Sequence, residues 1–101
     1  MTLFDPIEAD RRKVIGKALA ADRRSELLAA ARGFAAFIAR DGDTVTSDEV
    51  ANLMAHNGLD YAELGNAAGS VFDGKFVWTG AVVPSRRPAS HGRLIRVWRL
   101  R

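Results

Sequence analysis

The sequence contains no cysteine, and it has few features of membrane or secreted proteins. Without cysteine, disulfide bridges and thiolate metal sites are excluded. No apolar run approaches the roughly 20 residues that a membrane-spanning helix needs. The first six residues lack the basic and then apolar layout of a signal peptide. We therefore expect a cytoplasmic location, which is the host cytoplasm if the gene is viral.

Negative charge is also scarce, because no acidic residue follows Asp73. Residues 1–50 hold eight Lys/Arg and nine Asp/Glu, whereas residues 51–101 hold seven and three. A net charge of +3 that is distributed in this way predicts a basic footprint on one face. The alternative is that some of the late arginines pair with acids of the first half. The basic residues after Asp73 are Lys75, Arg86, Arg87, Arg93, Arg96, Arg99 and Arg101.

A length of 101 residues, 48% of them hydrophobic and 27% charged, is typical of a single globular domain. Residues 6–19 predict a first helix, with Asp5 as its cap, that forms an arm over residues 1–21 and is a candidate dimerisation element. The helical spacing of apolar residues is clearest over residues 22–40, which predicts a second helix. This helix is expected to stop at residues 41–43, with Gly42 as its left-handed C-terminal residue. Its apolar stripe consists of Leu27, Ala31, Phe34, Ala35 and Ile38, widened by Leu28 and Phe37.

Two shorter helices and two strands follow. Thr46 and Glu49 have the spacing of a capping box, which predicts a helix over residues 47–56. Asp60 is a plausible cap for a helix over residues 61–72, with Leu64, Ala68, Val71 and Phe72 buried, although its glycines leave open a start near Asn66. Period-two patterns predict strands over residues 76–83 and 94–100 around an arginine-rich loop, preceded by a short extended segment at residues 44–46.

Large aromatic residues are assigned to the core. Trp78 and Trp98 are expected to meet across the two strands, and the area that they bury favours packing over stacking on unpaired bases. The four phenylalanines assigned to the core are Phe34, Phe37, Phe72 and Phe76.

From residue 22 onward, this order of elements resembles a winged helix-turn-helix domain. The segments 65–72, 84–88 and 91–99 are also similar to small uncharacterised proteins of phages and prophages. The resemblance implies an α+β fold over residues 22–101, with a three-helix core and a C-terminal β-hairpin as the wing. It also implies DNA binding, transcription regulation and a phage or prophage origin. The helical arm over residues 1–21 would be an addition to that fold.

The resemblance implies that residues 64–72 are the recognition helix. This segment departs from ordinary recognition helices because it has almost no long polar side chains, which base readout requires. Its outer face has only Asn66 and Ser70 as polar side chains that could contact bases. We therefore expect phosphate contacts to dominate the binding of double-stranded DNA. The candidate DNA-binding residues are Asn66, Ser70, Lys75, Arg86, Arg87, His91 and Arg93.

Catalytic and metal sites are not indicated. His56 and His91 are the only histidines and lie far apart, so too few ligands are available for zinc. His56 suits a helix C-terminus, whereas the role of His91 is open between phosphate contact and a turn. No serine has the setting of a nucleophile. We expect no enzyme and no cofactor, and the alternative to DNA binding is a protein-interaction module that inhibits or recruits a host protein.

Overall fold

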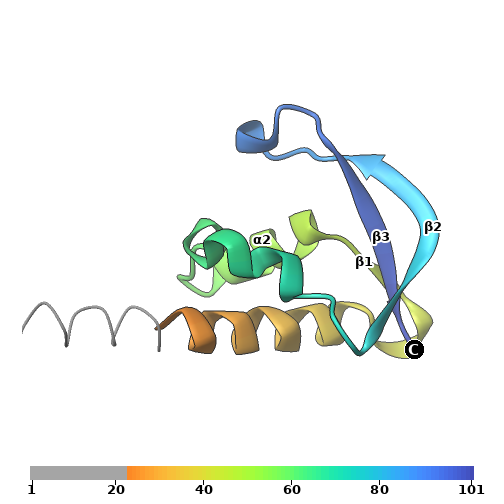
Figure 1. Ribbon diagram of the computed structural model, residues 1–101, viewed down its shortest axis with the longest axis horizontal. Helices are drawn as coiled ribbons and strands as arrows, with labels where there is room; N and C mark the ends of the chain where they lie inside the picture. Colours follow the sequence, from red (N-terminus) through yellow and green to blue (C-terminus); the bar gives the residue numbers. More distant parts are fainter. Residues whose placement is uncertain (1–22) are drawn as a thin grey trace, which may run out of the picture.

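The computed structural model describes residues 23–101, which form a mixed α+β domain with a three-stranded antiparallel sheet (Figure 1). The predicted arm, with its helix over residues 6–19, lies outside the described residues. The described chain begins with a helix over residues 23–38. The elements that follow are η1 (Arg40–Gly42), β1 (Thr44–Val45), α2 (Ser47–His56), η2 (Tyr61–Ser70), β2 (Phe76–Pro84), η3 (Pro88–Ser90) and β3 (Leu94–Leu100).

The helix over residues 23–38 turns its predicted stripe toward the core, with one exception. Leu27, Ala31 and Ala35 are buried, and Ala39 continues their line. The assignment of Phe37 to the core was wrong, because 57% of this residue is exposed. Phe37 follows Ala35 by two positions, about 200° around the helix, and this rotation turns its ring to solvent. Gly42 ends the segment with a φ of 84°, as predicted.

The helix α2 has the predicted bounds and the predicted cap. The Thr46 hydroxyl accepts a hydrogen bond from the backbone N–H of Glu49, and Val50 and Met54 are buried. The helix ends at His56, whose Nδ1 lies 2.8 Å from the carbonyl oxygen of Asn52.

The predicted helix over residues 61–72 is only partly correct. Asp60 does cap it by accepting a hydrogen bond from the N–H of Ala62, but η2 is a 3₁₀ segment that ends at Ser70. Gly65 interrupts it with a φ of 54° and a ψ of −129°, a conformation that favours glycine. Leu64 is nevertheless fully buried, and the two residues after Ser70, Val71 and Phe72, are buried as well.

The sheet has the strand order β1-β3-β2, so β3 lies in the middle. Trp78 pairs with Trp98, as predicted, and Val45 of β1 pairs with Trp98 from the other side. The register of β2 shifts between Trp78 and Val82, where Gly80 has a φ of 91°. Figure 1 shows the hairpin of β2 and β3 rising from the end of the long helix and curling back above the helical part.

The aromatic residues around the Trp78–Trp98 pair differ in how deeply they are buried. Phe72 stacks on Trp98 with ring centroids 5.2 Å apart and meets Phe76 edge-on at 5.4 Å. Packing is therefore confirmed for Phe72, Phe76 and Trp98, whereas Trp78 is 46% exposed. In the part of the chain that the structure describes, no helix is long and apolar enough to cross a bilayer.

Candidate nucleic-acid interface

The hairpin tip is an ordered turn rather than an open loop. The backbone N–H of Ser85 donates to the carbonyl of Arg93 over 2.7 Å and closes the loop. Inside it, η3 is followed by His91 with a φ of 49° and Gly92 with a φ of 74°. The His91 N–H donates to the carbonyl of Pro88, so its backbone has the predicted turn role, and its side chain is exposed.

One carboxylate holds the tip against α2. Asp48 accepts hydrogen bonds from the Ser85 hydroxyl at 2.7 Å, the Arg86 N–H at 2.7 Å and the Arg87 Nε at 2.9 Å. Its side chain is 13% exposed and that of Arg87 is 30% exposed. The Arg87 guanidinium carbon also lies 4.8 Å from the ring centroid of Tyr61. We call Asp48, Ser85, Arg86 and Arg87 the tip clasp.

Burial and the contacts of the tip clasp shift the pKa of Asp48 and that of the neighbouring Tyr61. Burial raises the pKa of Asp48, but the hydrogen bonds from Arg86, Ser85 and Arg87 outweigh burial and hold that pKa below its ordinary value. Burial raises the pKa of Tyr61, with the nearby Arg87 opposing and Asp48 adding to the rise. Both groups therefore keep their ordinary charge states near neutral pH, with Asp48 ionised and Tyr61 neutral.

The predicted binding residues divide between the two ends of the hairpin. Arg86 and Arg93 lie at the tip, are exposed and make no salt bridge with a carboxylate among residues 23–101. Arg87 lies there too, but its charge is neutralised by Asp48, which confirms for this residue the alternative of pairing with first-half acids. Lys75 precedes β2 at the other end, about 25 Å away along the nine-residue strand.

The two predicted residues of η2 have different surroundings. Asn66 is exposed, directly after the interruption at Gly65. Ser70 is half-buried, and its carbonyl oxygen accepts hydrogen bonds from Nε and Nη2 of Arg32 at 3.2 and 3.0 Å. The exposed part of η2 therefore offers small side chains and one amide, with Glu63 as its charged residue.

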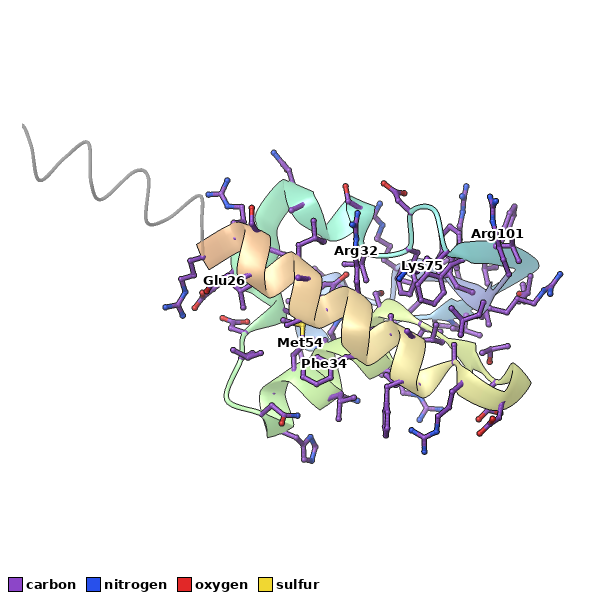
Figure 2. The ribbon with its side chains drawn as sticks, turned by 90° about the horizontal axis from the view of Figure 1, so that it is seen from below. Glu26, Arg32, Phe34, Met54, Lys75 and Arg101 are labelled. Atoms are coloured by element: carbon purple, nitrogen blue, oxygen red, sulfur yellow. The ribbon has the colours of Figure 1, made fainter. Side chains whose placement is uncertain are left out.

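Arg32 and Arg101 were missed as members of the basic surface at the hairpin base. Arg32 reaches the end of η2, and the Arg101 N–H donates to the Lys75 carbonyl over 3.0 Å. Figure 2 shows Arg32, Lys75 and Arg101 following one another along the same side of the molecule. The exposed Asp73 belongs to the same turn and offsets part of their charge. Arg101 lies beside Lys75 because β3 pairs antiparallel with β2. The predicted pairing of the two strands could therefore have suggested that these two residues are neighbours.

A groove of about 730 Å³ lies beside the tip clasp and is lined by residues of β1, α2, the hairpin strands and the tip. Its walls carry charges of both signs, because Asp48 and Glu49 face it together with Arg86 and Arg87. A polyanion would gain little by entering this groove, so the exposed Arg86 and Arg93 are the basic residues of the tip that are best placed to meet one from solvent.

Within residues 23–101, no three His, Asp or Glu side chains come together as potential metal ligands. A comparison of the chain with protein-family models, curated proteins and solved structures returned no match.

Proposed function

We propose that the protein binds double-stranded DNA through the sugar–phosphate backbone, with the β2–β3 hairpin as its main contact. One observation carries this proposal. Seven basic residues and no acidic residue follow Asp73, and in the described part of the chain only Arg87 among them pairs with a carboxylate. Uncompensated arginines on a projecting hairpin suit phosphate oxygens, which guanidinium groups bind bidentately.

The arrangement of the elements supports a winged-helix scaffold as part of this proposal. A short strand, α2, η2 and a long hairpin follow the first helix, and β1 and β2 flank β3. In such a scaffold η2 would face the groove of the duplex. Because η2 is broken at Gly65 and offers only the short amide side chain of Asn66, it would contribute close approach rather than base readout.

The predicted binding is therefore salt-dependent and weakly sequence-specific. Each phosphate contact that is lost should flatten the slope of log K against log salt by about 0.9. We exclude Arg87 from the charge-removal test, because its loss would also open the tip clasp. The informative variant is Arg86→Ala/Arg93→Ala, which removes two exposed charges that have no carboxylate partner within residues 23–101.

The test is fluorescence anisotropy with a duplex of mixed sequence at roughly 50 and 200 mM salt, the range over which counterion release is measured. The double variant should bind more weakly to every duplex, with a slope flatter by about two contacts. Arg24→Glu is the matched control, because it lowers the net charge by the same two units at an exposed arginine of the first helix that makes no salt bridge within residues 23–101. Equal losses in both variants, or no loss in the hairpin variant, would contradict the proposal. Absence of binding at low salt would favour the protein-interaction alternative.

A further inference from the structure

The helix over residues 23–38 carries an apolar strip that the rest of the described chain does not cover. Phe37 is 57% exposed, and a shallow groove of about 450 Å³ beside it is lined by Ala30, Gly33, Phe34, Phe37 and Leu53. A second hollow of about 340 Å³ adjoins it through Ala30 and is also lined by Glu26. Figure 2 shows this helix in front of the other elements, with Glu26 near its beginning.

The strip has a regular composition. It has five members, which are spaced alternately four and three residues apart and so lie on one line along the helix. They are Glu26, Ala30, Gly33, Phe37 and Arg40. Arg40 follows the helix but stays on this line, because its guanidinium carbon lies 3.8 Å from the ring centroid of Phe37. The line starts with an acid, ends with a base, and has its smallest residue in the middle. We call these five residues the helix seam.

We propose that the helix seam is the contact surface for a second copy of this chain. Placing two such helices antiparallel about a two-fold axis at Gly33 makes the pairs complementary in size and charge. Each Phe37 then packs on Ala30 of the other copy, each Glu26 meets Arg40 of the other copy, and the backbones approach at Gly33. An isologous contact of this kind needs one self-complementary patch, which the helix seam supplies.

The charges at the two ends cannot satisfy each other within one chain. Glu26 and Arg40 are separated by about 21 Å along the helix, given its rise per residue. Within the described residues Glu26 makes no salt bridge, and Arg40 makes only a long one of 3.9 Å to the exposed Asp41. Within residues 23–101, Glu26 therefore has no ionic partner and Arg40 has only this long one, so both side chains can pair across a two-fold axis.

The contact is small, so the dimer should be weak and reversible. One helix face buries less than the roughly 800 Å² per partner of a standard interface, so we expect a weak, transient contact with a Kd of roughly micromolar to millimolar. Sedimentation velocity of the full chain without DNA, from about 10 μM to 1 mM, covers most of this range. Because no DNA is present, the result is independent of the proposed function.

Charge reversal provides the sharpest test. Glu26→Arg and Arg40→Glu each place two like-charged pairs across the axis, so each should weaken self-association about tenfold or more. An equal mixture of the two variants recreates two opposite-charged pairs and should form a heterodimer with about the parent's affinity. Arg24→Glu, on the same helix but off the seam, is the matched control and should leave the dimer unchanged.

A further variant tests the apolar centre. Phe37→Ala should abolish the dimer while leaving the far-ultraviolet circular dichroism unchanged, because the ring is mostly exposed. A chain that remains monomeric at about 1 mM overturns the proposal. So does a dimer that persists in Phe37→Ala, because the contact would then lie elsewhere, for example in the candidate dimerisation element of residues 6–19. Failure of the two folded charge variants to associate when mixed also overturns it.

Discussion

The two ends of the β2–β3 hairpin are attached to the same helical part by different chemistry. At the base, Phe72 lies between Phe76 and Trp98, and its ring packs on both of the others. At the tip, Asp48 receives three hydrogen bonds from Ser85, Arg86 and Arg87. The base therefore depends on apolar burial, which is insensitive to pH, whereas the tip depends on one ionised carboxylate.

The difference shows how a strongly basic hairpin can be held in place without losing its charge. An apolar anchor at the base uses none of the arginines, and the tip clasp uses only the charge of Arg87. Arg86 contributes its backbone N–H to the clasp and keeps its guanidinium exposed. Adjacent arginines thus have separate roles, one in folding and one available for a ligand.

The largest effect is expected at the base. Phe72→Ala removes a ring that is 8% exposed and contacts two other rings, so it should lower the free energy of unfolding by about 3–5 kcal/mol. Urea unfolding followed by tryptophan fluorescence measures this loss. Phe37→Ala is the matched control and should cost less than about 1 kcal/mol at concentrations where the chain is monomeric, because Phe37 is mostly exposed. Equal losses would remove the distinction between the base aromatics and the exposed ring.

A smaller loss is expected at the tip. Asp48→Ala leaves the half-buried Arg87 without its carboxylate and should cost about 2–3 kcal/mol in urea unfolding. Asp43→Ala is the control, because Asp43 is exposed and its side chain has no polar partner among residues 23–101. A double-mutant cycle with Arg87→Ala separates the pair from the general effect of an acid in the first turn of α2. A coupling energy near zero would show that the tip clasp does not stabilise the fold.

Acid should weaken the tip and spare the base. The folded state holds the pKa of Asp48 below its ordinary value of 3.8, so its stabilising contribution is complete above that pH and is lost as the pH falls through the folded-state pKa. The difference in unfolding free energy between the parent and Asp48→Ala should therefore shrink from about pH 6 to pH 3, whereas the difference for Phe72→Ala should stay the same. A constant difference for Asp48→Ala would contradict the assignment.

A still smaller effect is expected between the two ends. Arg96 lies 4.5 Å from the ring centroid of Trp78, which is itself 46% exposed. Arg96→Ala should lower the free energy of unfolding by about 0.5–1 kcal/mol, as expected for an exposed cation–π contact. Arg86→Ala, which keeps its backbone bond to Asp48, should change stability by less than about 0.5 kcal/mol. A loss above that of Asp48→Ala would show that the middle of the hairpin, and not its ends, holds it in place.

Features that depend on neighbouring residues were predictable from the sequence. The capping box at Thr46 and Glu49 fixed the start of α2, and the alternating pattern located both long strands. The buried residues Leu64 and Phe72 were also predicted, although the segment between them has another geometry. The 3₁₀ conformation was missed because the spacing of apolar residues does not reveal the special backbone angles of Gly65.

Features that join distant residues were not predictable in detail. Asp48 lies 37 to 39 positions before its three partners, and Arg32 lies 38 positions before Ser70. The charge distribution left open that some arginines after Asp73 pair with acids of the first half. Only the folded chain shows that Arg87 is the one that pairs with Asp48. The separation of Lys75 from Arg86 and Arg93 has the same origin, because one strand places them at opposite ends. Binding to DNA by these residues stays a prediction.

The register shift in β2 has a consequence for how the molecules behave in a concentrated solution. β2 is an edge strand of the sheet. Edge strands with exposed apolar side chains, such as Val82 and Val83, can pair with strands of other chains and start aggregates. Between Trp78 and Val82 the strand advances four residues while β3 advances two, and the Ala81 carbonyl is already occupied by the Trp78 indole N–H. An incoming strand would lose its ladder of hydrogen bonds halfway along. We therefore expect the irregular stretch around Gly80 to protect this edge from fibril-like growth.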